Sequence, residues 1–259
     1  MNDLSHFDYR VTATKSQLRN ARIESRTMPR NSLNSLLLLA IVVLLTNHPS
    51  LAASAAPDPT QWSAVMRAFE IGDIECPPPP NEIVFIGSSS IALWKTIGKD
   101  IAPLRVINRG FGGSTMGDAV YWLDAIALKY HPRAVVVYEG DNDTAAGSTP
   151  EEVLINFERL ISRLHAASSH TRVYFLAIKP SILRWSHWSQ MARANQLIRA
   201  RCEQESRCHF IDVASPMIDQ GRPREDIFAP DKLHMNAKGY DLWTSIIRPA
   251  LLERETTNN

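Results

Sequence analysis

The chain is poor in cysteine and carries no excess of charge of either sign, and each shortage excludes a class of function. Only 3 of its 259 residues are cysteine, and none of the three has the spacing of a zinc-binding or redox motif. The 28 basic and 27 acidic residues leave a net charge of +1, which gives no support to nucleic-acid binding as the main task. We therefore expect a protein without a nucleic-acid partner and without a cysteine-bound metal.

The N-terminal part of the sequence lacks an apolar run of membrane-spanning length. The run "LLLLAIVVLL" at 36–45 has ten residues, whereas a spanning helix needs about 20. Arg26 and Arg30 precede this run, and small residues follow it as far as Ala55, which is the order of regions in a signal peptide. We expect export to the periplasm or the medium after cleavage near Ala55, with an uncleaved membrane anchor as the alternative.

The sequence is organised in three parts: an N-terminal extension, a short lead-in and one domain. The polar stretch before the apolar run is long for a signal peptide, so we expect the true start at Met28 and treat 1–55 as an N-terminal extension with its signal peptide. Residues 56–80 hold a short amphipathic helix around 62–71 and then "PPPP", a stiff extended spacer. Residues 81–259 have the usual size of a single domain.

Short apolar runs alternate with segments of helical spacing in this domain. The clearest helix is expected at 149–166, where Thr149 is placed to cap, Pro150 takes the first helical position and Glu152 completes a capping box. Buried strands joined by helices are typical of a parallel sheet covered on both faces. The sequence predicts a three-layer α/β/α domain with a central five-stranded parallel sheet, with strands at 83–86, 104–108, 134–138, 172–178 and 209–213.

Two cysteines lie six positions apart where an expected helix ends and a strand begins. In an oxidising compartment, Cys202 and Cys208 could close a small loop, with a stabilisation of about 2–3 kcal/mol from chain entropy. Two unlinked thiols are the equally weighted alternative. Cys76 has no partner left.

Polar stretches follow the strands at the edge where parallel sheets bind their ligands. The first strand leads directly into "GSSS", residues 87–90. Serine at such a turn commonly caps the next helix. It can also serve as a nucleophile, but then it needs an adjacent base.

His234 is the best candidate for that base among the eight histidines. Asp231 precedes it by three residues in a Pro-flanked loop before a helix. Asp231 can therefore bond one imidazole nitrogen and leave the other free to accept a proton from serine. A bare D-x-x-H is common by chance, and an aspartate capping a turn beside a solvent-exposed histidine is the alternative.

Two further stretches offer hydrogen-bond donors for an oxyanion. Gly112 and Gly113 in "RGFGGST" let the backbone approach closely and aim an N–H group. Glycine-rich loops also cradle phosphates, but this one lacks the order of a nucleotide-binding motif. Asn142 in "EGDND" supplies a side-chain amide, with a turn-forming asparagine as the alternative.

Taken together, four stretches resemble the ordered blocks of the SGNH/GDSL hydrolase family. The stretches "FIGSSSI", "NRGFGGST", "YEGDND" and "DKLH" follow the family's order of Ser, Gly, Asn and His, each on a strand-end loop. The resemblance covers the chain from about Asn81 to the C-terminus and implies the flavodoxin-like fold of that family. One position departs from the pattern, because Ser88 stands where the family usually has an acid.

The resemblance implies a role for each matching residue. Ser89 would be the nucleophile, His234 its base and Asp231 the residue that orients the base. The N–H groups of Ser89 and Gly113 and the amide of Asn142 would form the oxyanion hole.

This resemblance implies a serine hydrolase that cleaves carboxylic esters without a metal or organic cofactor. Its substrate would be a small ester, a lipid or an acylated sugar, as for an acetylesterase or a lysophospholipase. An α/β-hydrolase is excluded because Ile91 stands where the second glycine of G-x-S-x-G should be. Two alternatives stay open: a catalytically silent glycan- or lipid-binding module of the envelope on the same fold, and an acyltransferase that uses the same residues.

The stretch "AIKPSILRWSHW" at 177–188 is a candidate part of the substrate pocket. Trp185 and Trp188 are predicted to line an acyl or sugar pocket, with packing of a long loop as the alternative. Lys179 and Arg184 could meet an anionic substrate, although charged loop residues are usually solvated.

Overall fold

The computed structural model of the chain describes residues 58–255. The expected signal peptide, the start at Met28 and the cleavage near Ala55 lie outside these residues. Among residues 58–255, no helix combines the length and the apolar character needed to cross a membrane. The described residues all lie in one compact unit.

The five expected strands form one parallel sheet with the order β2-β1-β3-β4-β5. Every residue of β1 and β3 is buried, as expected for strands covered on both faces. The predicted ends differ by up to two residues, because apolar side chains next to a strand can be buried without joining its hydrogen-bond ladder. The strands are β1 (Ile83–Gly87), β2 (Val106–Gly110), β3 (Ala134–Tyr138), β4 (Arg172–Leu176) and β5 (Cys208–Ile211).

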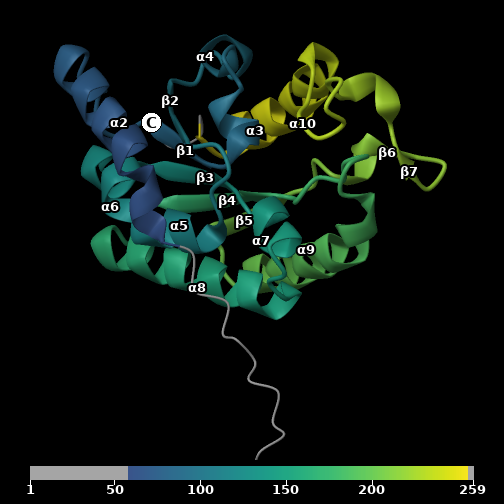
Figure 1. Cartoon of the computed structure of the whole chain (residues 1–259). Coiled ribbons are helices and arrows are strands. Elements are labelled where there is room, and N and C mark those ends of the chain that lie inside the picture. The colour runs from purple at the N-terminus through teal and green to yellow at the C-terminus, as the bar shows by residue number, and fades with distance from the viewer. Residues whose placement is uncertain (1–57, 256–259) are drawn as a thin grey trace, which may run out of the picture. The chain divides into compact units, whose positions relative to one another are not determined.

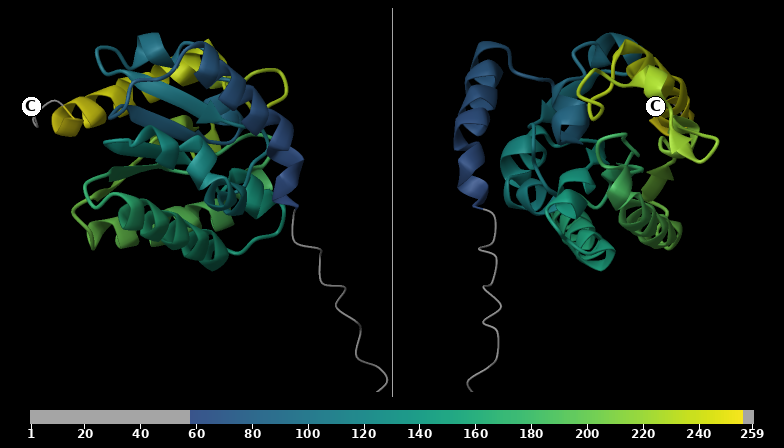
Figure 2. Two further views of the ribbon diagram at one scale, coloured as in Figure 1. Left: turned by 90° about the vertical axis from the view of Figure 1, so that its left-hand side faces the viewer. Right: turned by 45° about the vertical axis from the view of Figure 1, so that its right-hand side comes forward.

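Helices cover both faces of the sheet, which confirms the three-layer architecture (Figures 1 and 2). Alternate residues of one strand enter different cores: Val84 packs with one layer of helices, and Phe85 packs with the other. The first layer contains α5 (Met116–Tyr121), α6 (Leu123–Ile126), α8 (Pro150–Ala167) and α9 (Trp188–Glu203). The second layer contains α3 (Ser89–Ala92), α4 (Ile97–Asp100) and α10 (Ala237–Glu255).

Helix α8 has the capping box that its sequence predicts. The Thr149 side chain accepts a hydrogen bond from the Glu152 N–H at 3.2 Å, and the Glu152 carboxylate accepts one from the Thr149 N–H at 2.8 Å. Pro150 is the first residue of the helix. Its buried stripe is the predicted one: Val153, Phe157, Leu160, Ile161 and Leu164.

The lead-in helix is longer than expected and contacts the edge strand β2. We expected a helix around 62–71, whereas a 3-10 turn at Pro59–Trp62 continues into α2 (Ser63–Glu75). Near its C-terminal end, Asp73 contacts Arg109 of β2, and its carboxylate lies 2.6 Å from Lys129 Nζ. Figure 2 shows α2 at the side of the sheet, and its buried Met66 packs with the core of the first layer.

Short elements complete the chain, and most of them lie in connections. The sequence did not indicate the two-stranded antiparallel sheet of β6 (Ile218–Asp219) and β7 (Arg222–Pro223). The others are α7 (Asp141–Ala145) and the 3-10 turns Leu128–Tyr130, Trp185–His187, Ser215–Met217 and Glu225–Ile227.

All three cysteines are free thiols in the structure. Cys202 and Cys208 are both buried, and the hydrogen bond between their thiols, together with burial, raises the pKa of Cys208. The structure therefore shows the unlinked alternative, with the two thiols in contact. Cys76 is exposed.

Candidate active site

Ser89 is the accessible member of the serine triplet that follows β1. Gly87 has φ +146°, and a Cβ there would lie 2.2 Å from the Tyr138 carbonyl oxygen, so only glycine fits this turn. The next residue, Ser88, occupies the N-cap position of α3 without a side-chain capping hydrogen bond, and Ser89 begins the helix. Ser88 and Ser90 are each 2 % exposed, whereas Ser89 is partly exposed. Burial therefore distinguishes three adjacent serines that the sequence presents as equals.

The structure joins Ser89, His234 and Asp231 in one hydrogen-bonded row. His234 Nε2 lies 3.0 Å from Ser89 Oγ, and His234 Nδ1 lies 2.6 Å from Asp231 Oδ2. The carboxylate also accepts the backbone N–H groups of Leu233 at 3.0 Å and of His234 at 2.9 Å. The hydrogen bond from His234, followed by these backbone donors, lowers the pKa of Asp231 to about 2. The aspartate is therefore a fixed anion beside the imidazole.

Gly113 lies on the loop after β2 in a conformation that requires glycine. Its φ is +86°, and a Cβ would lie 3.2 Å from the ring of Trp62. Among residues 58–255, neither the Gly113 N–H nor the Ser89 N–H has a hydrogen-bond acceptor. Both backbone donors are thus unoccupied. A Cβ built on the neighbouring Gly112 would lie 3.8 Å from Ser89 Cβ, which shows how near this loop comes to the serine.

Asn142 lies in the first turn of α7, beyond the end of β3. Its Nδ2 donates to the Ser114 carbonyl oxygen at 2.7 Å, and its Oδ1 accepts a hydrogen bond from Arg184 at 2.9 Å. A carbonyl only accepts and a guanidinium only donates, so both neighbours require the same orientation of the amide. The second hydrogen on Nδ2 is then available to another acceptor.

Two acidic residues near Asn142, Glu139 and Asp143, are buried, which sequence reasoning did not foresee. Glu139 is completely buried and accepts a hydrogen bond from Ser114 Oγ at 2.5 Å. Burial, and then the charge of Asp143, raise the pKa of Glu139 well above its ordinary value. Asp143 accepts the N–H groups of Met116 and Gly140 at about 3 Å, and burial raises its pKa to about 6. These carboxyl groups connect the loop after β2 with the loop after β3.

The charge of Lys179 and Arg184 had suggested that they are solvated loop residues. The structure shows that they are not. The Lys179 side chain is 1 % exposed, and its Nζ lies 3.1 Å from Asp141 Oδ2. Arg184 donates to Asp141 Oδ1 at 2.5 Å and is 20 % exposed. The expectation failed because the sequence does not show that Asp141, at the end of a buried strand, is their partner. The three acidic residues within "EGDND" were the sequence signal that could have indicated such a partner.

The two tryptophans proposed for a substrate pocket are stacked on each other. The ring centroids of Trp185 and Trp188 are 5.8 Å apart, with an angle of 11° between the planes. Trp188 also packs against the cores on both faces of the sheet, which is the packing alternative. A third tryptophan, Trp62, was not foreseen as part of the site, although it contacts the Gly113 loop and packs edge-on against Phe111.

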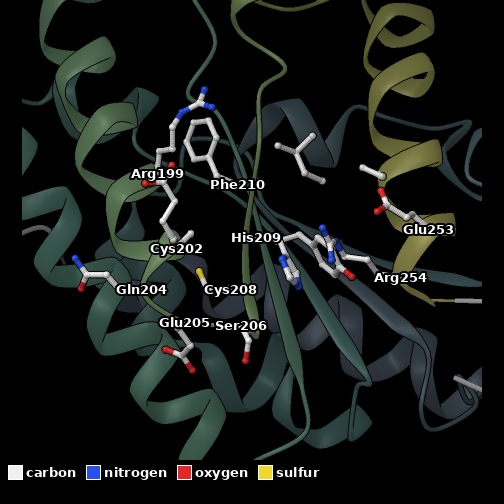
Figure 3. A pocket seen from close by; sticks show the side chains of 14 residues that line it. Arg199, Cys202, Gln204, Glu205, Ser206, Cys208, His209, Phe210, Glu253 and Arg254 are labelled. Carbon is white, nitrogen blue, oxygen red and sulfur yellow. The ribbon is translucent and has the colours of Figure 1, made fainter. Parts of the chain in front are cut away.

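A separate pocket lies along the edge strand β5, between α9 and α10. Arg199, Cys202, Cys208, His209 and Arg254 are among its lining side chains (Figure 3). It shares no lining residue with the row of Ser89, His234 and Asp231. Among residues 58–255, no group of three or more His, Cys, Asp or Glu side chains is arranged to hold a metal ion.

Comparisons with known proteins find relatives in sequence and in fold. The chain is 27% identical over 193 residues to the platelet-activating factor acetylhydrolase IB subunit alpha1 of Bos taurus, covering 70% of this chain and 78% of that protein. It superposes on a GDSL-like lipase from Bacteroides thetaiotaomicron with a TM-score of 0.62 and 18% identity, covering 73% of this chain and 98% of the other. A structure from Streptococcus pneumonia gives 0.66 and 19%, covering 85% and 100%.

A family model described as "GDSL-like Lipase/Acylhydrolase family" matches residues 92–242. This match spans more than half of the chain and includes Gly113, Asn142, Asp231 and His234, while Ser89 lies just before it. The sequence blocks, the parallel sheet and the matching model lead to one conclusion. The chain belongs to the GDSL-like lipase/acylhydrolase family, also called SGNH.

Proposed function

We propose that the protein is a serine hydrolase that cleaves carboxylic esters through an acyl-enzyme on Ser89. The observation that carries this proposal is the continuous row of hydrogen bonds from Asp231 through His234 to Ser89. Serine is a weak nucleophile without a base, and His234 Nε2 is within the distance needed to accept its proton.

The reaction follows from this row. His234 takes the proton of Ser89 as Oγ attacks the carbonyl carbon of the ester. His234 then gives this proton to the leaving alcohol, and an acyl-enzyme forms on Ser89. Water, activated by the same imidazole, attacks the acyl group and releases the acid. The ionised Asp231 stabilises the imidazolium that forms in each half of the reaction.

The negative charge that develops on the carbonyl oxygen needs donors that are already in place. The unoccupied N–H groups of Ser89 and Gly113 and the second amide hydrogen of Asn142 supply three. None of them must break another hydrogen bond to act. No step of this chemistry requires a metal or an organic cofactor.

We propose acetyl and other short acyl esters as the first substrate class to test. This is supported by the similarity to a protein named as an acetylhydrolase subunit. Lysophospholipids and acylated sugars remain the longer and bulkier members of the series. The signal-peptide pattern of the sequence supports action outside the cytoplasm, on small molecules, lipids or acylated sugars of the envelope.

The test is hydrolysis of p-nitrophenyl esters, from acetate to palmitate, by the full chain and by three serine variants. Ser89→Ala should remove activity, whereas Ser88→Ala and Ser90→Ala, on the buried neighbours, should keep it when folded. Equal activity in Ser89→Ala would show that another residue is the nucleophile. Inactivity of the wild type on the whole series would favour the catalytically silent binding module.

A further inference from the structure

Arg184 forms an ion pair with Asp141 and also contacts Asn142, the candidate oxyanion donor. One amino group of Arg184, Nη1, donates both to Asp141 Oδ1 at 2.5 Å and to Asn142 Oδ1 at 2.9 Å. Asp141 and Asn142 are adjacent, so a single nitrogen fixes two neighbouring side chains. The Arg184–Asp141 pair differs from a surface ion pair, because the Asp141 side chain is only 6 % exposed.

The position of Arg184 is itself fixed from several directions. Lys179 holds the other oxygen of Asp141 at 3.1 Å, and two cations therefore share one buried carboxylate. Burial would raise the pKa of Asp141, but the charges of Lys179 and Arg184 lower it below its ordinary value. The Arg184 N–H donates to Ser181 Oγ at 3.2 Å, and the Leu183 N–H donates to the Lys232 carbonyl at 3.0 Å. The last bond connects this loop to the loop that carries His234.

We propose that Arg184, held by the Asp141 carboxylate that Lys179 also binds, is a positioning residue that keeps the amide hydrogens of Asn142 directed at the oxyanion. This proposal rests on the ester hydrolysis proposed above. Without Arg184, Asn142 Oδ1 loses its donor, and only the Ser114 carbonyl holds the amide in place. The amide could then rotate, and its second hydrogen would no longer be presented before the reaction begins.

A positioning role predicts a particular pattern of kinetic effects. Loss of one oxyanion donor costs about 10²–10³ in kcat, and a loosened donor should cost less, so we expect Arg184→Met to lower kcat by about 10- to 100-fold. KM should stay the same, since a donor to the transition state contributes little to ground-state binding. Arg184→Lys keeps the charge but loses the planar fork, and it should recover part of the lost kcat.

The deciding experiment is a double-mutant cycle with Asn142→Ala, measured on p-nitrophenyl acetate. If Arg184 acts through Asn142, Arg184→Met should cost nothing further once the amide is absent. The same cycle with Arg184→Lys carries the test if Arg184→Met does not fold. Arg193→Ala is the matched control, because Arg193 also pairs with a carboxylate on another helix but is 54 % exposed, and it should leave kcat unchanged.

Three outcomes would overturn the proposal. An equal loss of kcat in the Asn142→Ala background would show that Arg184 acts by another route. A rise in KM alone would show that Arg184 binds an anionic substrate group directly. The rate at which a fluorophosphonate labels Ser89 separates a failure of the role of Arg184 from a failure of the proposed function. A wild-type Ser89 that is not labelled overturns both proposals. Normal labelling together with an additive cycle overturns only the role of Arg184.

Discussion

His234 Nε2 lies 3.0 Å from Ser89 Oγ, although 145 positions of sequence separate the two residues. Ser89 begins a helix directly after the first strand, and His234 lies in the loop before the last helix. Both are brought to the C-terminal edge of the sheet, because all five strands run in the same direction. A backbone bond from Ala229 N–H to the His234 carbonyl, 2.8 Å long, closes the loop that presents the imidazole.

Replacement of Asp231 by asparagine should slow ester hydrolysis strongly without unfolding the protein. An amide can hold the imidazole in the wrong tautomer and carries no charge to stabilise the imidazolium, so we expect kcat to fall by about 10²- to 10⁴-fold. Asp226→Asn is the control, since Asp226 is an exposed carboxylate paired with Arg224 in the same part of the chain. Activity within a few fold of wild type in Asp231→Asn would contradict the role assigned to this carboxylate.

The pH profile of kcat/KM should show an acid limb that depends on one proton. Asp231 has its pKa lowered to about 2, so it stays ionised from pH 7 down to about 4 and adds no second proton to this limb. Asp143 has a pKa of about 6 and could mimic this limb, but it contacts the Met116 and Gly140 N–H groups rather than the row. The limb should therefore persist in Asp143→Asn. A slope of two in the logarithmic plot, or a limb lost in Asp143→Asn, would contradict this interpretation.

Gly113→Ala should reduce both stability and activity, while Gly147→Ala should reduce stability alone. Both glycines have positive φ, +86° and +95°, where a Cβ costs about 1–2 kcal/mol. A Cβ at Gly113 would also approach Trp62 to 3.2 Å, whereas nothing lies within 4 Å of one at Gly147. Displacing the Gly113 N–H should lower kcat by up to about 10²-fold. Denaturant unfolding and kcat, measured on both variants, separate the two effects, and equal kcat values would argue against Gly113 as a donor.

Glu255→Gln should lower the free energy of unfolding by about 1.5–3 kcal/mol, because it removes the charged acceptor of several hydrogen bonds. The Glu255 carboxylate is fully buried and accepts two hydrogen bonds from Arg172, at 2.7 and 2.8 Å, and one from Tyr174 at 2.6 Å. Glu203→Gln, on an exposed position of α9, is the matched control and should change little.

The stabilisation by Glu255 should also depend on pH. Burial opposes ionisation of Glu255, but the hydrogen bonds from Arg172 and Tyr174 outweigh it and lower the pKa below its ordinary value. The folded state therefore binds its proton less readily than the unfolded chain. The contribution is fully present above the unfolded pKa of about 4.3 and is lost as pH falls through the folded value. A difference in unfolding free energy between wild type and Glu255→Gln that stays constant from pH 7 to pH 3 would contradict this sign.

The sequence by itself determined the architecture and named the residues of the candidate site. Five apolar runs separated by helical patterns are a local signal, and they predicted a parallel sheet. The order of the strands and their exact ends came only from the structure. The blocks around Ser89, Gly113, Asn142 and His234 were identifiable because each is a short motif directly after a strand or before a helix.

Tertiary structure decided which of the polar residues are buried and what they contact. Ser88, Ser89 and Ser90 are chemically identical, and only the fold leaves the middle one accessible. Arg184 reaches Asn142 across 42 positions of sequence, so no local pattern could show that a loop cation donates a hydrogen bond to the amide. Burial and long-range contact depend on how the elements pack, whereas periodicity and short motifs report only what lies within a few residues.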